Sequence, residues 1–122
     1  MVRGVTERKK PLQEPTLLIL TALADAPRHG YALSQEITQM SEGRVKLRTG
    51  TLYGALERLQ ADGLIAVFAE ERVEGRLRRT YTLTAQGRQT LTEEARRLAA
   101  TAREATRRLN NAPDSGTAEA LA

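Results

Sequence analysis

The stretch RTGTLYGALERLQADGLIAVF, residues 48–68, followed by GRLRRTYTLT, residues 75–84, decides the fold of this chain. Leu52, Leu56 and Leu59 fall on one side of a short helix, and Gly63 ends it. We expect Thr49 to cap the helix by accepting a hydrogen bond from one of its unpaired N–H groups. The order of patterns predicts a helix, a strand, a turn and a second strand.

The two predicted strands form an antiparallel hairpin with a charged tip. Residues 64–69 have the β-branched and aromatic content of a strand, Gly75 marks the turn, and residues 77–83 alternate in polarity. Four arginines near the tip (Arg72, Arg76, Arg78 and Arg79) stand among three acids (Glu70, Glu71 and Glu74). Basic side chains on a protruding turn suit a phosphate backbone, although edge strands also carry them to prevent aggregation.

Two further helices precede this stretch. Pro15 suits a first helical turn, and leucines at helical spacing predict a helix over residues 15–25, before Pro27. A second helix is predicted over residues 31–40, with Leu33, Ile37 and Met40 on its buried face. The segment 28–30 is expected to be a turn, and the alternation in residues 45–47 is compatible with a short strand before the third helix.

A long helix is predicted from Thr84 to Asn110, because this segment contains no proline. Leu91, Leu98 and Ala105 recur every seven residues, and Ala95, Ala102 and Leu109 each follow four later. Such a helix is about 39 Å long at roughly 1.5 Å per residue, more than a small core covers. Its apolar stripe therefore predicts a partner helix, and with it a homodimer.

The predicted fold is mainly α with a small β-hairpin: a winged helix-turn-helix followed by a long C-terminal dimerisation helix. Residues 1–13 are expected to be a flexible basic arm and residues 14–83 the DNA-binding domain. Residues 84–110 are expected to form the dimerisation helix and residues 111–122 a disordered tail.

The composition favours some classes of function and excludes others. The 122 residues suffice for one domain, and 19 Lys and Arg against 15 acids favour a polyanionic partner. With no Cys and only His29, we expect no metal, no cofactor and no enzyme. His29 is interpreted as a turn residue. A cytoplasmic location is expected, because the first ten residues lack the apolar centre of a signal peptide.

The outward face of the third helix suits a DNA major groove. It presents Thr51, Gly54 and Arg58, with Lys46 and Arg48 just ahead of the helix. Hydroxyls can meet base edges or phosphates, and arginine can bind guanine with two hydrogen bonds. A helix N-terminus also favours phosphate. The alternative is an ordinary solvated face.

With these residues in view, the chain resembles the PadR family of transcriptional regulators, specifically its short members with one C-terminal helix. The similarity lies in His29-Gly30-Tyr31-x-Leu33, Gly50-Thr51-Leu52-Tyr53, Arg58-Leu59, Asp62-Gly63-Leu64-Ile65, Gly75-Arg76, Arg78-Arg79-x-Tyr81-x-Leu83-Thr84 and Gly87. It covers roughly residues 15–108. It implies a homodimeric repressor that an effector releases from its promoter.

Together, the residue pattern and the resemblance give two sets of candidate residues. The candidate DNA contacts are Tyr31, Ser34, Lys46, Arg48, Thr49, Gly50, Thr51, Tyr53, Gly54, Arg58, Arg76, Arg78 and Arg79. The candidate dimer contacts are Leu17, Leu20, Leu91, Ala95, Leu98, Ala102, Ala105 and Leu109.

Two departures from the family pattern matter. Gly54 stands where the family usually has proline, and Phe68 replaces a frequent tryptophan. Some relatives hold flat aromatic effectors between dimer aromatics, whereas this chain has no Trp and a single Phe. We therefore expect a small effector or none.

Two other functions remain open at this point. A winged-helix protein-interaction module that does not bind DNA is favoured by the three wing acids. An RNA-binding protein is a third possibility, but readers of single-stranded RNA usually expose more aromatic side chains.

Overall fold

The computed structural model describes residues 10–113. The order of elements is α2 (Glu14–Ala22), β1 (Arg28–His29), α3 (Gly30–Met40), α4 (Thr49–Ala61), β2 (Ile65–Val73), β3 (Arg76–Leu83) and α5 (Ala85–Asn110). The strands form one antiparallel sheet in the order β1-β3-β2. This confirms a winged helix followed by a long C-terminal helix. Most of the predicted arm (residues 1–13) and of the predicted tail (residues 111–122) lies outside the described residues.

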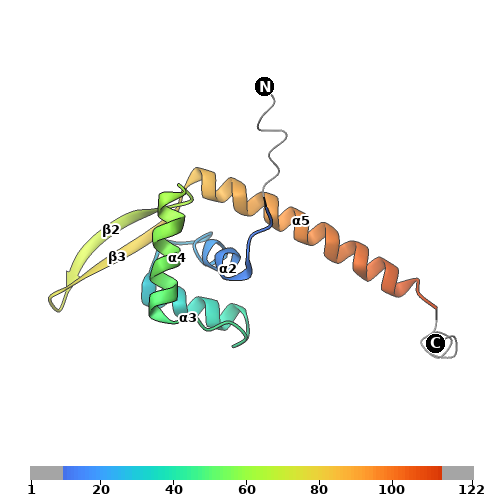
Figure 1. Ribbon diagram of the computed structural model, residues 1–122, viewed down its shortest axis with the longest axis horizontal. Helices are drawn as coiled ribbons and strands as arrows, with labels where there is room; N and C mark the ends of the chain where they lie inside the picture. Colours follow the sequence, from blue (N-terminus) through green and yellow to red (C-terminus); the bar gives the residue numbers. More distant parts are fainter. Residues whose placement is uncertain (1–9, 114–122) are drawn as a thin grey trace, which may run out of the picture. The chain divides into compact units, whose positions relative to one another are not determined.

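The chain divides into two compact units, the first ending at Thr92 and the second beginning at Glu93. Helices α2 to α4, the sheet and the first turns of α5 belong to the first unit (Figure 1). α5 passes through the division as one continuous helix.

Aliphatic side chains from α2, α3 and α4 build the core of the first unit. Ile19 and Leu20 of α2 and Leu33 and Ile37 of α3 are fully buried. From α4 come Leu52, Ala55, Leu56 and Leu59, and the sheet adds Ile65, Tyr81 and Leu83. The predicted buried faces of the second and third helices are confirmed, except that Met40 is 36% exposed in the last turn of α3.

The short strand considered for residues 45–47 is absent from the described chain, and the third strand lies elsewhere. Arg28 and His29, predicted as a turn, pair with Tyr81 and Thr80 of β3. After α3, the buried Ser41 hydroxyl accepts a hydrogen bond from the Val45 N–H at 2.9 Å and donates one to the Ile37 carbonyl at 2.8 Å. Because Ser41 satisfies that N–H, the loop needs no strand partner here.

The caps of α3 and α4 differ from expectation. His29 is the N-cap of α3, and its Nδ1 accepts from the Ala32 N–H at 3.3 Å. Thr49 was expected to cap α4, but it is the first helical residue and extended Arg48 takes the cap position. The carbonyl of Arg48 accepts from Leu52, and its side chain makes no capping hydrogen bond within the described chain.

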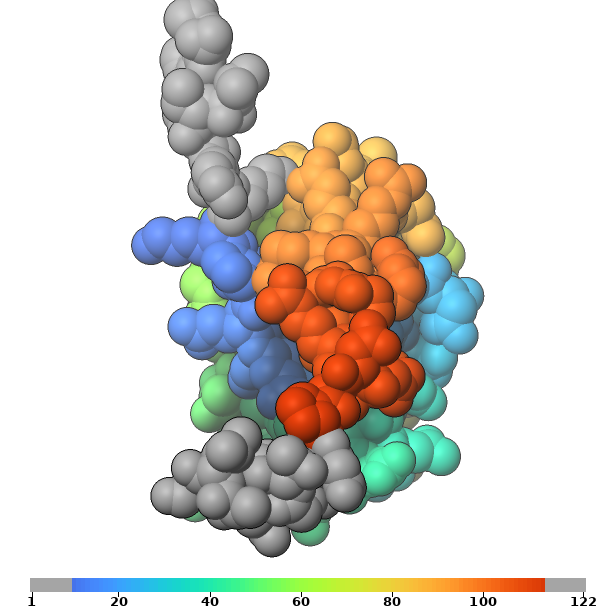
Figure 2. All heavy atoms as spheres, turned by 90° about the vertical axis from the view of Figure 1, so that its right-hand side faces the viewer, coloured from blue at the N-terminus to red at the C-terminus, as the bar shows by residue number. Residues whose placement is uncertain are grey.

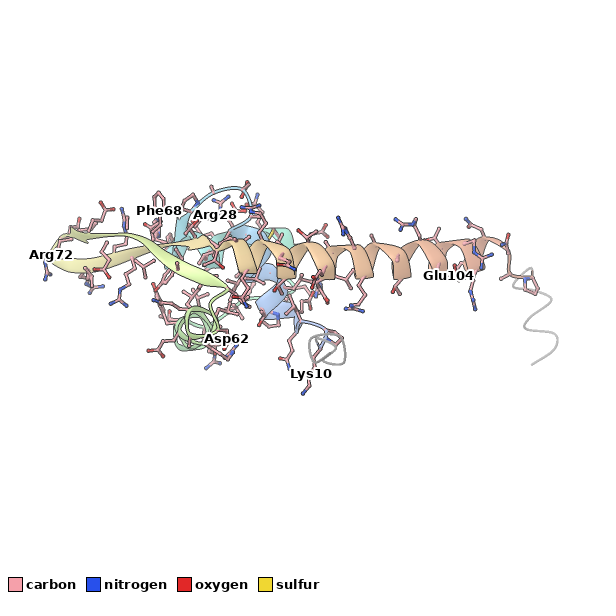
Figure 3. All side chains as sticks on the ribbon, turned by 90° about the horizontal axis from the view of Figure 1, so that it is seen from above. Lys10, Arg28, Asp62, Phe68, Arg72 and Glu104 are labelled. Atoms are coloured by element: carbon pink, nitrogen blue, oxygen red, sulfur yellow. The ribbon has the colours of Figure 1, made fainter. Side chains whose placement is uncertain are left out.

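The hairpin of β2 and β3, the wing of the fold, is longer than the sequence predicted. β2 continues through the charged residues expected in a loop and reaches Val73. Glu74 and Gly75 then turn the chain with positive φ angles of 52° and 78°. A bulge leaves Phe68 without a partner between the Val67–Tyr81 and Ala69–Thr80 pairs. The Phe68 side chain, 63% exposed, lies on the side of the wing away from α4 (Figure 3).

One junction joins the end of α4 to the base of the wing and the start of α5. Gly63, at φ +79°, donates to the Gln60 carbonyl and Leu64 donates to that of Leu59, which together end α4 in a Schellman motif. The Thr84 hydroxyl donates to the Gly63 carbonyl at 2.7 Å and accepts from the Gly87 N–H at 2.9 Å. The predicted cap of the last helix is therefore confirmed.

Within the described residues, the second unit consists of the rest of α5 and residues 111–113. The last turns of α5, coloured dark orange to red, face the viewer in Figure 2. The Glu104 carboxylate binds Arg107 at 2.6 Å and also contacts Arg108, and these hydrogen bonds, first that of Arg107, lower its pKa. Among residues 10–113, no helix is both long and apolar enough to cross a membrane.

The packing of Gly87 yields a stability prediction. A Cβ on Gly87 would lie 2.0 Å from the Leu64 carbonyl oxygen, which belongs to the backbone of the junction. We expect Gly87→Ala to lower the free energy of unfolding by about 1–3 kcal/mol in urea titrations.

Gly54→Ala is the matched control, because a Cβ at that helical position meets nothing within 4 Å. It should stabilise the protein by up to about 1 kcal/mol, since alanine favours a helix interior over glycine. Equal effects of the two substitutions would contradict the described junction.

Candidate nucleic-acid interface

The exposed face of α4 is the centre of the candidate interface. Its buried side consists of the leucines and Ala55 that enter the core. The predicted outward residues Thr51, Gly54 and Arg58 are all exposed, as are Glu57 and Ala61. This surface combines a hydroxyl, a glycine and a guanidinium with one carboxylate, so it can both donate to and accept from base edges.

The N-terminal end of α4 offers unpaired backbone donors. Because Arg48 provides no side-chain cap within the described residues, the first N–H groups of the helix have no capping partner. Thr49, Gly50 and Thr51 are exposed there, and Lys46 and Arg48 are exposed on the preceding loop. Free N–H groups, the helix dipole and two cations make this end electropositive.

α3 contributes one exposed aromatic side chain beside this end. Tyr31 is 68% exposed, and its hydroxyl accepts a hydrogen bond from Gln35 Nε2 at 3.2 Å. Ser34, on the same helix, is half-buried. A shallow depression lies along the outward residues of α3, including Ser34, Gln35 and Thr38. The part of the candidate interface that α3 supplies therefore consists of Tyr31 and the polar side chains around it.

Tyr53 connects α4 to the start of α3. A Cβ on Gly30 would lie 2.1 Å from the Tyr53 hydroxyl oxygen, so the tyrosine ring packs directly over that glycine. The ring is 46% exposed. The glycine in the His29-Gly30-Tyr31 motif thus has a structural reason, namely the close approach of Tyr53, which the sequence alone did not reveal.

The wing arginines are not equally available. Arg78 binds Glu71 at 2.7 Å, and Arg79 binds Glu70 through its Nε at 2.8 Å. Arg72 lies at the tip, where it donates to the Gly75 carbonyl at 3.4 Å (Figure 3). Arg76, next to the turn, is exposed.

A groove of about 310 Å³ separates α4 from β3. Gly50, Tyr53, Gly54, Glu57 and Gln60 line one side, and Arg79 and Tyr81 line the other. Hydrogen bonds and charge from Glu70, with a smaller contribution from Tyr81, raise the pKa of Arg79, so this cation remains charged. Burial raises the pKa of the Tyr81 phenol, an effect that a hydrogen bond with Arg79 partly opposes.

All thirteen predicted DNA contacts lie in the first unit, and all but the half-buried Ser34 are exposed. They come from α3, the loop before α4, α4 itself and β3. Arg72 was assigned to the hairpin tip but left out of the predicted contacts. The tight turn at Glu74-Gly75 makes it as prominent as Arg76.

The predicted dimer contacts fall into three groups. Leu98 is 39% and Leu109 is 76% exposed, and the alanines of the same stripe, Ala95, Ala102 and Ala105, are exposed as well. Leu17 and Leu91 are half-buried in the first unit. Leu20 is fully buried in the core of the first unit, so it lines no surface that a second copy could reach.

No group of His, Cys, Asp and Glu within the described residues has the spacing of a metal site. The single histidine caps α3. The exposed faces thus offer hydroxyls, cations and backbone donors, a set of groups that suits polyanion recognition.

The comparison with protein families also indicates a protein that binds a polyanion, namely a transcriptional regulator. The model described as "Transcriptional regulator PadR-like family" matches residues 19–93. "Transcriptional regulator Rv3488" of Mycobacterium tuberculosis is 45% identical over 89 residues, covering 72% of this chain and 78% of that protein. A protein in transposon TN4556 of Streptomyces fradiae is 46% identical over 83 residues, which span 68% of this chain but only 22% of that protein.

Solved structures share the fold. The structure of Bacillus subtilis PadR in complex with operator DNA aligns with a TM-score of 0.60 and 21% identity, over 66% of this chain and 47% of that one. At this identity the match supports the winged-helix architecture.

The burial of Tyr81 predicts how stability depends on pH. The folded protein favours the neutral phenol, so the unfolded chain loses this proton first as the pH rises through about 10. The ionisation of Tyr81 should therefore leave the free energy of unfolding unchanged below about pH 10 and should lower it as the pH rises further.

Urea titrations between about pH 8 and pH 11 test this expectation. Tyr81→Phe should show a smaller fall than the parent, whereas Tyr31→Phe, which alters a 68% exposed side chain, should keep the parental fall. Identical pH profiles for the parent and Tyr81→Phe would refute the assignment.

Proposed function

Because the chain belongs to the PadR-like family of transcriptional regulators, we propose that it is a sequence-specific DNA-binding protein that represses transcription as a homodimer. Its operator is a near-palindrome, and α4 is the helix that reads it. The observation that carries this proposal is the exposed face of α4, with a free N-terminal end flanked by cations and hydroxyls.

In this proposal α4 enters the major groove with its N-terminal half foremost. Thr49 and Thr51 contact phosphates or base edges, and Arg58 reads a guanine. Gly50 and Gly54 leave room for close approach, because nothing lies within 4 Å of a Cβ built at either position. Lys46 and Arg48 contact the flanking phosphates.

The second contact is made by the wing and by α3. Arg72 and Arg76 extend from the hairpin tip toward the phosphate backbone or the minor groove, and Arg78 and Arg79 stand farther back along β3. Tyr31 supplies a hydroxyl to a phosphate beside α4. Bacillus subtilis PadR, which shares this fold, was solved in complex with operator DNA, and this supports DNA as the ligand.

Dimerisation is assigned to the apolar stripe of α5. Leu98 and Leu109 are exposed on one side of α5, and the alanines of the same stripe allow close helix packing. A twofold pair of chains can place two α4 helices in successive major grooves, about 34–36 Å apart. Such a spacing requires an operator with two related half-sites.

Repression and its release are inferred from the family resemblance. A dimer bound over a promoter excludes the transcription machinery, and an effector that alters the dimer would release it. Flat aromatic effectors have few partners in this chain, which has three Tyr, one Phe and no Trp. We therefore propose a small effector or none, and tight binding of a planar aromatic compound in calorimetry would refute this part.

One observation favours a second candidate, a winged-helix module that binds a protein instead of DNA. Two of the wing arginines are paired with carboxylates, which reduces the positive potential of the wing. The DNA-binding measurement described next separates the two candidates, because an interaction module would bind no duplex with sequence preference.

Arg58→Ala tests the assignment of α4. The parent should bind DNA from its own upstream region more tightly than a scrambled duplex in fluorescence anisotropy titrations. Loss of a bidentate contact should cost about 1–3 kcal/mol on the preferred duplex and little on the scrambled one.

Arg103→Ala is the charge-matched control, because Arg103 is an exposed arginine of α5 outside this surface. It should leave the sequence preference intact. If the parent shows no preference between the two duplexes at any salt concentration, the proposed function is wrong.

Leu98→Glu tests the assignment of the dimer. A charge in the apolar stripe should raise the dimer dissociation constant by roughly tenfold or more in sedimentation equilibrium experiments. Ala100→Glu adds the same charge on the opposite side of α5 and should leave the dimer intact.

A parent protein that sediments as a monomer at micromolar concentration would contradict the proposed homodimer. A dimer that Leu98→Glu and Ala100→Glu weaken equally would place the interface elsewhere.

A further inference from the structure

The wing contains two acidic residues placed directly opposite two of its arginines. In the register of the hairpin Glu70 pairs with Arg79 and Glu71 pairs with Arg78. The carboxylates contact the guanidinium groups at 2.8 Å and 2.7 Å. Because these are neighbours across one ladder, the backbone itself holds each acid next to its base.

The other charged residues of the wing are arranged differently. Arg72, Glu74 and Arg76 cluster at the turn, and none of them takes part in an ion pair within residues 10–113. Glu74 stands in the turn itself, at a φ of 52°. The same short hairpin therefore holds two paired acids and one unpaired acid, all exposed.

We propose that Glu70 and Glu71 limit the affinity of the wing for DNA by occupying Arg79 and Arg78 until a phosphate displaces them. This inference rests on the proposed DNA-binding function. Arg72 and Arg76 form the phosphate contact for which no carboxylate has to be displaced. Arg78 and Arg79 contact a phosphate only after it has displaced the carboxylate of Glu71 or Glu70, respectively.

The energies make this exchange feasible. The guanidinium groups of both pairs are about half exposed, with side-chain exposures of 43% for Arg78 and 49% for Arg79. An ion pair in water at this exposure is weak, so a phosphate of DNA can replace the carboxylate. The replacement contributes less than a contact with a free arginine, because one attraction is lost as the other forms.

This limit acts equally on every DNA sequence. Phosphate contacts supply the sequence-independent part of binding and its dependence on salt. The two acids should therefore lower the affinity for operator and scrambled DNA by the same factor. The preference for operator over scrambled DNA is still determined by α4.

The experiment compares Glu70→Gln and Glu71→Gln with Glu74→Gln in the full chain. Each substitution changes the net charge by the same amount and keeps the shape of the side chain, but only the first two free an arginine. Affinity for the protein's own upstream duplex and for a scrambled duplex is measured by fluorescence anisotropy at four salt concentrations. Circular dichroism melting curves verify that each variant is folded.

We expect Glu70→Gln and Glu71→Gln each to raise the affinity for both duplexes by about two- to fivefold, the range set by the strength of an exposed ion pair. The gain should shrink as salt rises, because salt weakens the ion pair that the parent must break, so each variant should steepen the slope of log affinity against log salt by less than the about 0.9 of one whole added phosphate contact. Glu74→Gln removes the same charge from the tip but frees no arginine, so it should raise the affinity by less than either of the other two variants.

A double-mutant cycle separates the pair from general electrostatics. With Arg78→Ala in the background, Glu71→Gln should no longer steepen the slope. Equal effects of all three glutamine variants, or weaker binding by the first two, would overturn the inference while leaving the proposed function in place. A parent that binds neither duplex would refute the proposed function itself, and this inference with it.

Discussion

The first unit depends on one junction, at which the end of α4, the base of the wing and the start of α5 meet. The Thr84 hydroxyl binds the Gly63 carbonyl, and the Thr84 N–H binds the Leu64 carbonyl at 3.1 Å. Gly87 packs against the same carbonyl with no room for a side chain. Both of the proposed DNA contacts, α4 and the wing, leave from this point, so its geometry determines how they stand relative to each other.

This arrangement explains why small residues appear at these positions. Gly63 adopts a left-handed conformation that ends α4 and starts β2 two residues later. Thr84 serves both as a partner of that turn and as the cap of α5. A short side chain with one hydroxyl performs both tasks, because it can donate to one side and accept from the other. The glycine and the threonine are thus constraints of the fold, and the exposed face of α4 is left for recognition.

Much of the architecture could be predicted from the sequence, because it follows from periodicity and turn chemistry. Apolar residues at helical spacing predicted α2, α3, α4 and α5, and Gly75 predicted the hairpin turn. What could not be predicted depends on contacts between distant residues. The strand at Arg28 and His29 exists only because β3 lies beside it, and the loop after Ser41 is held by a buried hydroxyl. The length of β2 was missed because its charged residues resemble a loop until they are paired across the ladder.

The candidate site likewise has some features that could be predicted from the sequence and others that could not. Exposure of the α4 residues was predictable from the helix period, because the opposite face had to be buried. The pairing of Glu70 and Glu71 was not, since it depends on the register that the bulge at Phe68 sets. The sequence suggested that three acids weaken the case for a DNA-binding wing. In the structure two of them hold arginines, and the tip keeps Arg72 and Arg76.

The most direct measurement is a chemical-shift map of the isotope-labelled protein with and without its own upstream duplex. The account predicts that amide signals change around Tyr31, through residues 46–54 and at the tip around Arg72 and Arg76, while those of α2 stay in place. Changes confined to α2 or to α5, with α4 and the wing unaffected, would contradict it.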